Sequence, residues 1–240
     1  MRRALVTGGA KGIGLAIAER LRDLGVEVAI LGRDAGAIEA SGFRSRVADV
    51  TDAGAFEAAI DTLGPFDILV NNAGAAVAAP FGRHRREDWD AMLAVNLTSC
   101  FTACQRVLPG MVERGWGRIV NVASTAGLKG YAYTTAYCAA KHGVIGLTRA
   151  LAVEVAKTGV TVNAVCPGFT DTAMVDRAAA VIAGKRGTSE GEARAVLAGM
   201  SPQGRLVLTG EVADAVVFLC GEGAAAMTGV SLAIAGGEVM

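Results

Sequence analysis

Short runs of apolar residues alternate along this chain with longer segments whose apolar residues recur every three or four positions. The first run, residues 3–7, leads through a glycine-rich turn into a segment in which Ile13, Ile17, Leu21 and Leu24 share one helical face. Continuously apolar runs of this length are typical of parallel strands that are covered on both faces. Further strands are expected at residues 26–31, 47–50, 67–74, 117–123, 160–165 and 230–234.

Strands that alternate with helices at this spacing predict an α/β fold, a single Rossmann-type, doubly wound sheet of seven parallel strands with helices on both faces. Long helical stretches are expected at residues 89–114 and 134–157, and a shorter one at 211–220. Residues 173–204 are rich in alanine, glycine and charge, with helical patches and no strand. Because ligands bind at the carboxyl ends of such strands, we expect this segment to form a substrate lid there.

Composition narrows the function classes. The 240 residues suit one domain (1–240), and 23 basic residues balance 23 acidic ones, which argues against a nucleic-acid partner. No apolar run reaches membrane-spanning length without a charge or a glycine cluster, and the N-terminus leads directly into a strand, so we expect no membrane partner and no signal peptide. The five cysteines are isolated and only two histidines are present, which argues against a metal site and disulfides and favours the cytoplasm.

The turn after the first strand has the spacing Gly-x-x-x-Gly-x-Gly, which is neither the Gly-x-Gly-x-x-Gly fingerprint nor a P-loop. Glycines let the backbone approach a pyrophosphate, and the start of the next helix offers free N–H groups and positive dipole. An ordinary tight turn is the alternative. The flanking strand and helix favour a dinucleotide phosphate site, made by Gly8, Lys11, Gly12, Ile13 and Gly14.

Arg33 follows the second strand, where a dinucleotide fold reads the adenosine ribose. An acid there accepts from the 2′-hydroxyl of NAD, whereas an arginine suits the 2′-phosphate of NADP. Gly32 stands in the place of the acid, and Lys11 could reach the same phosphate, so the sequence favours NADP(H) over NAD(H). Asp34 weakens this preference for NADP(H), because it could pair with Arg33 or cap the next helix.

Four polar residues stand where chemistry is expected. Tyr137 and Lys141 are four apart, so they share one helix face, and a nearby ammonium lowers the tyrosine pKa from about 10 toward the working range. A packed tyrosine beside a solvated lysine is the alternative reading. Ser124 ends the strand at 117–123, thirteen residues before Tyr137. Asn96 lies among apolar neighbours in a helix, where a buried amide needs hydrogen-bond partners.

Over essentially the whole chain these motifs resemble the classical branch of the short-chain dehydrogenase/reductase family. The resemblance rests on the glycine loop, Asn71-Asn72-Ala73-Gly74, Asn96, Ser124, Tyr137-x-x-x-Lys141 and Pro167-Gly168. The extended branch has a Gly-x-x-Gly-x-x-Gly loop and a longer chain, and this sequence has neither. Residues 117–127 and 140–148 are most similar to 3-oxoacyl-thioester and polyketide ketoreductases and to 3-hydroxyacyl-CoA dehydrogenases.

The resemblance implies a role for each residue. Tyr137 is the general acid that protonates the carbonyl oxygen, and the base in reverse. Lys141 lowers the tyrosine pKa and holds the nicotinamide ribose, while Ser124 positions the substrate oxygen. Asn96 holds a water that links Lys141 to solvent. The further cofactor contacts implied are Asp49, Val50, Asn72, Gly74, Tyr137, Lys141, Pro167, Gly168, Thr170 and Thr172.

The sequence thus predicts an NADP(H)-dependent oxidoreductase that interconverts a ketone and a secondary alcohol, with a 3-oxoacyl thioester as the expected substrate. Alternatives are an NAD-linked dehydrogenase of a hydroxyacyl-CoA or cyclic alcohol, and a nucleotide-sensing module without turnover. Lys185 and Arg186 in the lid could meet a CoA or phosphopantetheine phosphate, or be simply solvated. The two long helices carry more apolar surface than one sheet face covers, and the resemblance points to a homotetramer.

Overall fold

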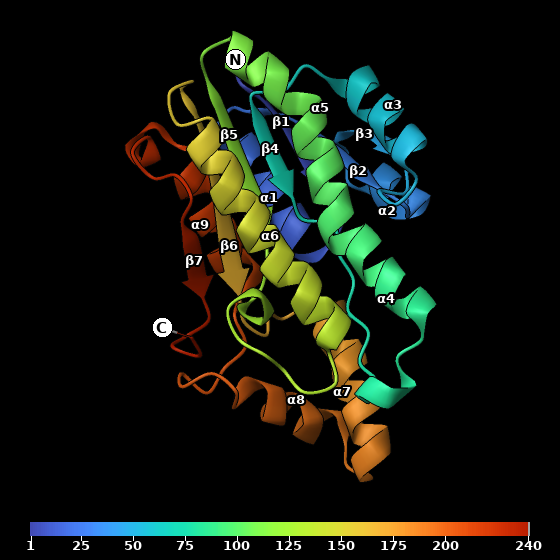
Figure 1. Ribbon diagram of the computed structural model, residues 1–240. Helices are drawn as coiled ribbons and strands as arrows, with labels where there is room; N and C mark the ends of the chain where they lie inside the picture. Colours follow the sequence, from blue (N-terminus) through green and yellow to red (C-terminus); the bar gives the residue numbers. More distant parts are fainter. Residues whose placement is uncertain (240) are drawn as a thin grey trace.

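The structure is a computed structural model that describes residues 1–239, and its centre is a seven-stranded parallel sheet in the order β3-β2-β1-β4-β5-β6-β7 (Figure 1). The predicted doubly wound Rossmann fold is therefore confirmed. The strand order reverses between β1 and β4, which places a topological switch point at their carboxyl ends. The strands are β1 (Arg3–Thr7), β2 (Glu27–Gly32), β3 (Arg44–Val47), β4 (Ile68–Asn71), β5 (Gly117–Val122), β6 (Val160–Pro167) and β7 (Ser231–Ile234).

Helices cover both faces of the sheet. On β1, Leu5 belongs to one buried cluster while Ala4 and Val6 belong to another, because successive strand residues point to opposite faces. One face is covered by α3 (Ala53–Leu63), α5 (Ser99–Glu113) and α6 (Thr135–Glu154). The other is covered by α1 (Gly12–Asp23), α2 (Ala35–Ala40) and α9 (Thr209–Cys220).

The third strand lies three residues earlier than the prediction of residues 47–50. β3 lies at the edge of the sheet and pairs with β2, and most of its side chains are exposed, so it lacks an apolar run. The buried residues Ala48 and Val50 follow the strand and pack into the core, and this produced the misplaced prediction. Asp49 between them accepts a hydrogen bond from the backbone N–H of Thr51 at 2.9 Å and turns the chain toward α3.

The helix predicted at residues 89–114 is interrupted. The chain forms α4 (Arg86–Leu93), a π-helical turn (Ala94–Thr98) and then α5, so the predicted helical stretch is present and contains a π turn that the sequence did not indicate. Asn96 lies inside the π turn, and its Nδ2 donates to the Met92 carbonyl at 3.0 Å. Single π turns inside α-helices are frequent at functional sites.

Residues 173–204 are helical without a strand, as predicted. They form α7 (Ala173–Arg186) and α8 (Glu190–Ala198), which extend beyond the carboxyl end of the sheet (Figure 1). Val175, Ala179 and Leu197 belong to a small buried cluster between these two helices. Within residues 1–239, no helix combines the length and the apolar character that crossing a membrane requires.

Candidate active site

The glycine loop joins β1 to α1 at the switch point. Gly8 and Gly12 have φ values of 63° and 53°, in the left-handed region that favours glycine. A Cβ at Gly14 would lie 2.3 Å from the carbonyl oxygen of Gly8, so no larger residue fits there. Lys11 is the N-cap of α1, yet no side chain among the described residues 1–239 caps this helix, and no acid lies in its first turn. The first amides of α1 therefore keep their N–H groups for an anion, and the loop fits a dinucleotide phosphate.

The loop after β4 supports the glycine loop from behind. Thr7 Oγ1 accepts hydrogen bonds from the backbone N–H groups of Asn72 and Ala73, both at 3.0 Å. Asn72 Nδ2 donates to the carbonyls of Thr7 at 3.0 Å and Gly8 at 3.2 Å. The side-chain N–H groups of Asn72, a predicted cofactor contact, thus hold the protein loop. Sequence reasoning missed Thr7, whose only signal was a hydroxyl at the end of an apolar strand.

The two predicted phosphate-binding cations each pair with a carboxylate. Lys11 bonds to Asp34, and Arg33 Nη1 lies 3.4 Å from Asp49 Oδ2. Asp34 also caps α2 through the N–H of Ala37, and the Lys11 hydrogen bond together with that cap lowers the Asp34 pKa. Partial burial raises the pKa of Asp49, but hydrogen bonds from Thr51 and the charge of Arg33 outweigh this effect. The pKa of Asp49 is therefore lowered. Exposed ion pairs of this kind are weak, so a bound phosphate can displace them.

Lys141 is buried, which rules out the reading of a solvated lysine beside a packed tyrosine. Its side chain is on α6 and the residue is 4% exposed. Its Nζ donates to the Val122 carbonyl, at the end of β5, at 2.8 Å and lies 5.7 Å from the centre of the Tyr137 ring. An ammonium has three donors, and within residues 1–239 Lys141 Nζ makes one hydrogen bond, so it keeps the capacity to bind hydroxyl groups.

Asn96, Gly74 and Lys141 meet at the carboxyl ends of β4 and β5. Asn96 Oδ1 accepts from the N–H of Ala75 at 3.2 Å, and its Nδ2 donates to the Ala75 carbonyl at 2.9 Å. A Cβ at Gly74 would lie 2.8 Å from Asn96 Oδ1 and 3.7 Å from Lys141 Nζ. The amide of Asn96 therefore fixes the π turn against the loop that follows β4 and holds it close to the ammonium.

Ser124 follows β5 at the same edge. Its Oγ accepts a hydrogen bond from the N–H of Ala126 at 3.1 Å and so starts the short helical turn Thr125–Gly127. A hydroxyl that accepts one bond still has its own proton to donate. Ser124 is thus held in place with a free donor, as a group that polarises a carbonyl requires.

The tyrosines near this edge have different environments. Burial and a hydrogen bond to Glu238 raise the pKa of Tyr131, whose hydroxyl also lies 2.6 Å from Thr125 Oγ1. Tyr131 is therefore held neutral and cannot act as a base near neutral pH. Tyr133 is 64% exposed with a φ of 69°, and this leaves Tyr137 as the tyrosine beside the ammonium. Sequence reasoning did not identify Glu238, an acid near the C-terminus.

The end of β6 and the segment after it, residues 167–172, lie at the same edge of the sheet as the glycine loop. The N–H of Gly168 donates to the Ile234 carbonyl at 3.0 Å, and Thr170 Oγ1 donates to the Gly168 carbonyl at 3.0 Å. A Cβ at Gly12 would lie 3.4 Å from Thr172 Cγ2, so this segment reaches back to the glycine loop. Pro167, at the end of β6, is buried. All of the predicted residues of this segment therefore lie at the same edge as the glycine loop.

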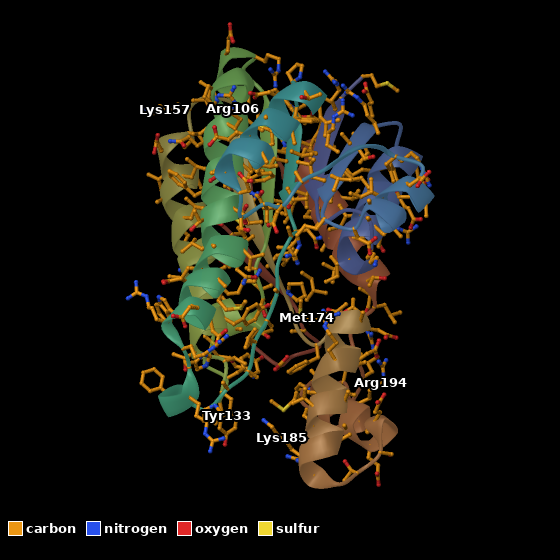
Figure 2. The ribbon with its side chains drawn as sticks, turned by 90° about the vertical axis from the view of Figure 1, so that its right-hand side faces the viewer. Arg106, Tyr133, Lys157, Met174, Lys185 and Arg194 are labelled. Carbon is orange, nitrogen blue, oxygen red and sulfur yellow. The ribbon has the colours of Figure 1, made fainter. Side chains whose placement is uncertain are left out.

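The helices beyond this edge are tied to it by one arginine. Arg194 on α8 bonds to Asp176 on α7, and its Nη2 lies 2.8 Å from Asp171 Oδ1 in the segment after β6. Figure 2 shows Lys185 of α7 at the same end of the molecule as Tyr133. Both side chains are exposed.

Comparisons with known proteins agree with this geometry. Residues 2–181 match the model of the short chain dehydrogenase family. The chain is 41% identical to a D-beta-hydroxybutyrate dehydrogenase of Cupriavidus necator, covering 98% of this chain and 97% of the relative. It is 40% identical to an acetoacetyl-CoA reductase of Rhizobium meliloti, covering 99% and 98%. A variant of actinorhodin polyketide ketoreductase, solved with NADPH, superimposes with a TM-score of 0.92 at 39% identity, covering 99% and 97%. This chain therefore belongs to the short chain dehydrogenase family, the oxidoreductases that act on hydroxyl and keto groups with NAD(P).

Proposed function

We propose that this protein is an NADP(H)-dependent oxidoreductase that interconverts a ketone and a secondary alcohol, with Tyr137 as the general acid and base. The observation that carries the proposal is the buried Lys141 ammonium beside Tyr137, at the same sheet edge as the uncapped start of α1. Lys141, Tyr137 and Ser124 bring an ammonium, a phenol and a hydroxyl to the edge of the sheet where ligands bind. Such a set forms a proton-transfer site rather than a group of side chains that only pack together.

In this proposal the chain holds the cofactor along the carboxyl edge. The N–H groups of Gly12, Ile13 and Gly14 would bind the pyrophosphate, and Lys11 and Arg33 would exchange their carboxylate partners for the 2′-phosphate. When bound, the dinucleotide supplies or accepts the hydride. The remaining contacts to the adenosine and nicotinamide ends are Gly8, Asp49, Val50, Asn72, Gly74, Pro167, Gly168, Thr170 and Thr172.

The residues that act on the proton and on the substrate oxygen lie on α6 and at the end of β5. Ser124 donates its hydroxyl hydrogen to the carbonyl oxygen of the substrate and stabilises the charge that develops there. Tyr137 transfers its phenolic proton to that oxygen in reduction and takes it back in oxidation. The Lys141 side chain lies beside Tyr137 and would bind the nicotinamide ribose hydroxyls with its unused donors. Asn96, through a water, connects Lys141 to solvent and completes the proton path.

For the substrate we propose a 3-oxoacyl thioester, carried by CoA or by a carrier protein, with α7 and α8 as its lid. Two relatives support this choice: the acetoacetyl-CoA reductase and the polyketide ketoreductase. The test is loss of reduced-nicotinamide absorbance with acetoacetyl-CoA, measured with NADPH and with NADH. We expect turnover with NADPH. Turnover of this thioester with neither cofactor would overturn the thioester proposal.

A second candidate is an NAD-linked dehydrogenase that works in the oxidative direction. It is favoured by the D-beta-hydroxybutyrate dehydrogenase relative and by the carboxylate partners that Lys11 and Arg33 already have. Faster turnover with NADH than with NADPH in the same assay would select it. A nucleotide-sensing module is the third class, and it would bind cofactor without turning over any ketone or alcohol.

We further propose that the enzyme is a homotetramer that works in the cytoplasm. The exposed apolar side chains of Phe101 and Val112 on α5 and Val153 on α6 support an interface along these helices, and all five cysteines are free thiols. Sedimentation at micromolar concentration is expected to give a tetramer. A monomer would contradict this assembly without affecting the proposed chemistry.

A further inference from the structure

A buried carboxylate near the C-terminus lies between the two segments that form the walls of the active site. The Glu238 side chain is 1% exposed, and its Oε1 lies 3.2 Å from Lys129 Nζ and accepts a hydrogen bond from the Tyr131 hydroxyl. Lys129 Nζ also donates to the backbone carbonyl of Glu238 at 3.3 Å. We call Lys129, Tyr131 and Glu238 the tail cluster. The proton transfer proposed above uses none of these three side chains.

On one side the tail cluster reaches the residue next to Ser124. The Tyr131 hydroxyl lies 2.6 Å from Thr125 Oγ1, and Thr125 is 3% exposed. Thr125 directly follows Ser124 and begins the helical turn that the Ser124 hydroxyl caps. A shift of the Tyr131 hydroxyl would therefore move the turn that fixes the Ser124 hydroxyl.

On the other side the tail cluster touches the segment after β6. A Cβ at Gly168 would lie 2.9 Å from Glu238 Oε2, so the carboxylate packs directly on this glycine. The Tyr131 ring meets the Phe169 ring edge to face, with centres 6.1 Å apart. The carboxylate and the phenol are thus shared between the two walls, one that carries Ser124 and one that carries the proposed nicotinamide contacts.

The burial of the carboxylate makes this arrangement specific. A buried charge is tolerated only with partners in good geometry, and here they come from one loop, residues 129–131. Burial and the bond to Glu238 raise the Tyr131 pKa, which keeps the phenol protonated as a donor. The Tyr131 hydroxyl therefore remains a hydrogen-bond donor to Glu238.

We propose that Glu238 is a positioning residue for the reaction: through Tyr131 and Thr125 it sets the Ser124 hydroxyl relative to the wall that begins at Gly168. The effect on rate rests on the proposed function, whereas the effect on the two walls does not. Small misplacement of a reacting group is enough to lower a rate substantially.

The kinetic test compares Glu238→Ala, Glu238→Gln and Tyr131→Phe in the full chain, with acetoacetyl-CoA and NADPH. Glu238→Ala and Tyr131→Phe are each expected to lower kcat about tenfold, a larger effect than on the Kd for NADPH. Glutamine still accepts from Tyr131 and should restore most of the rate. Because both changes break one path, the double variant should lose no more than the worse single variant. Glu19→Ala, an exposed acid on α1, is the control and should match the parent.

A second measurement needs no substrate. Hydrogen exchange of the NADPH-bound protein should be faster in Glu238→Ala at residues 124–131 and at 167–172, and unchanged in Glu19→Ala. An effect confined to residues 236–239, an unchanged kcat in Glu238→Ala, or additive losses in the double variant would overturn the proposal. A parent protein that consumes no NADPH would overturn the proposed function instead, and the exchange pattern would still decide whether Glu238 positions the two walls.

Discussion

Replacing Thr148 with valine should destabilise the protein, because it breaks a chain of buried hydrogen bonds beneath the helix that carries Tyr137. Asn71 Nδ2 on β4 donates to Asn121 Oδ1 on β5 at 2.8 Å, and Asn121 Nδ2 donates to Thr148 Oγ1 on α6 at 2.9 Å. Thr148 in turn donates to the Val144 carbonyl at 2.7 Å. Asn121 and Thr148 are 0% exposed, so no water replaces a lost partner.

The magnitude follows from the group left behind. Valine has nearly the shape of threonine, so the change leaves no large cavity, but one N–H of Asn121 loses its acceptor in the core. An unsatisfied buried donor costs about 1–3 kcal/mol, and we expect a loss of about 2 kcal/mol in the free energy of unfolding. For a chain of this length the melting temperature should fall by about 4–8 °C.

Thr161→Val is the matched control. Thr161 is on β6 and 6% exposed, and its Oγ1 is buried without a hydrogen-bond partner among residues 1–239. The same chemical change should there be neutral or stabilising. Urea unfolding and thermal melts of both variants give the comparison, and all are run at one protein concentration because assembly into the proposed tetramer makes stability depend on concentration. Equal losses in the two variants, or no loss in Thr148→Val, would refute the reasoning.

Three further predictions concern the cofactor loops and α9. Arg33→Ala should weaken NADPH about tenfold and NADH little, measured by fluorescence titration, and equal losses would remove Arg33 from the phosphate site. Gly14→Ala should weaken both cofactors by more than about tenfold, since its Cβ would lie 2.3 Å from a loop carbonyl, whereas Gly54→Ala in α3 should bind normally. Hydrogen bonds from Arg205 and from the backbone N–H of Leu208 lower the pKa of Glu211 from 4.5 to about 2, so the stabilisation by the Glu211 carboxylate is present above pH 4.5 and is lost as the pH falls toward 2. The Glu211 side chain is 36% exposed, so solvent weakens this effect. In urea unfolding, Glu211→Gln should therefore reduce by only about 1 kcal/mol the free energy of unfolding that the parent loses between pH 4.5 and pH 2. An unchanged pH profile would contradict the pairing.

The sheet could be predicted because its central strands are buried on both faces. β5 and β6 are buried at every position, and most of their residues are apolar, so they could be recognised as strands although each contains two polar residues. β3 could not be placed in the same way, since an edge strand with exposed arginines has no such run. The π turn at Asn96 was also invisible, because one extra residue in a helical turn hardly changes the apolar period.

The candidate site divides along similar lines. Two short motifs could be identified from the sequence, because a predicted strand or helix lies next to each. They contain Gly12 and Gly14, and Tyr137 and Lys141. Glu238 belongs to no motif: its partner Tyr131 is 107 residues away, and only the folded sheet brings them together. The hydrogen bonds between neighbouring strands and α6 are equally non-local, so no pattern in the sequence indicates them.

The most direct test of the central claim is turnover and cofactor binding by Tyr137→Phe. The parent should reduce acetoacetyl-CoA with NADPH, and the variant should lose at least about a hundredfold in kcat because the proton donor is gone. Its Kd for NADPH should remain that of the parent, since Lys141 and the glycine loop are intact. A variant that keeps the kcat of the parent would contradict the account, because Tyr137 would then not be the general acid.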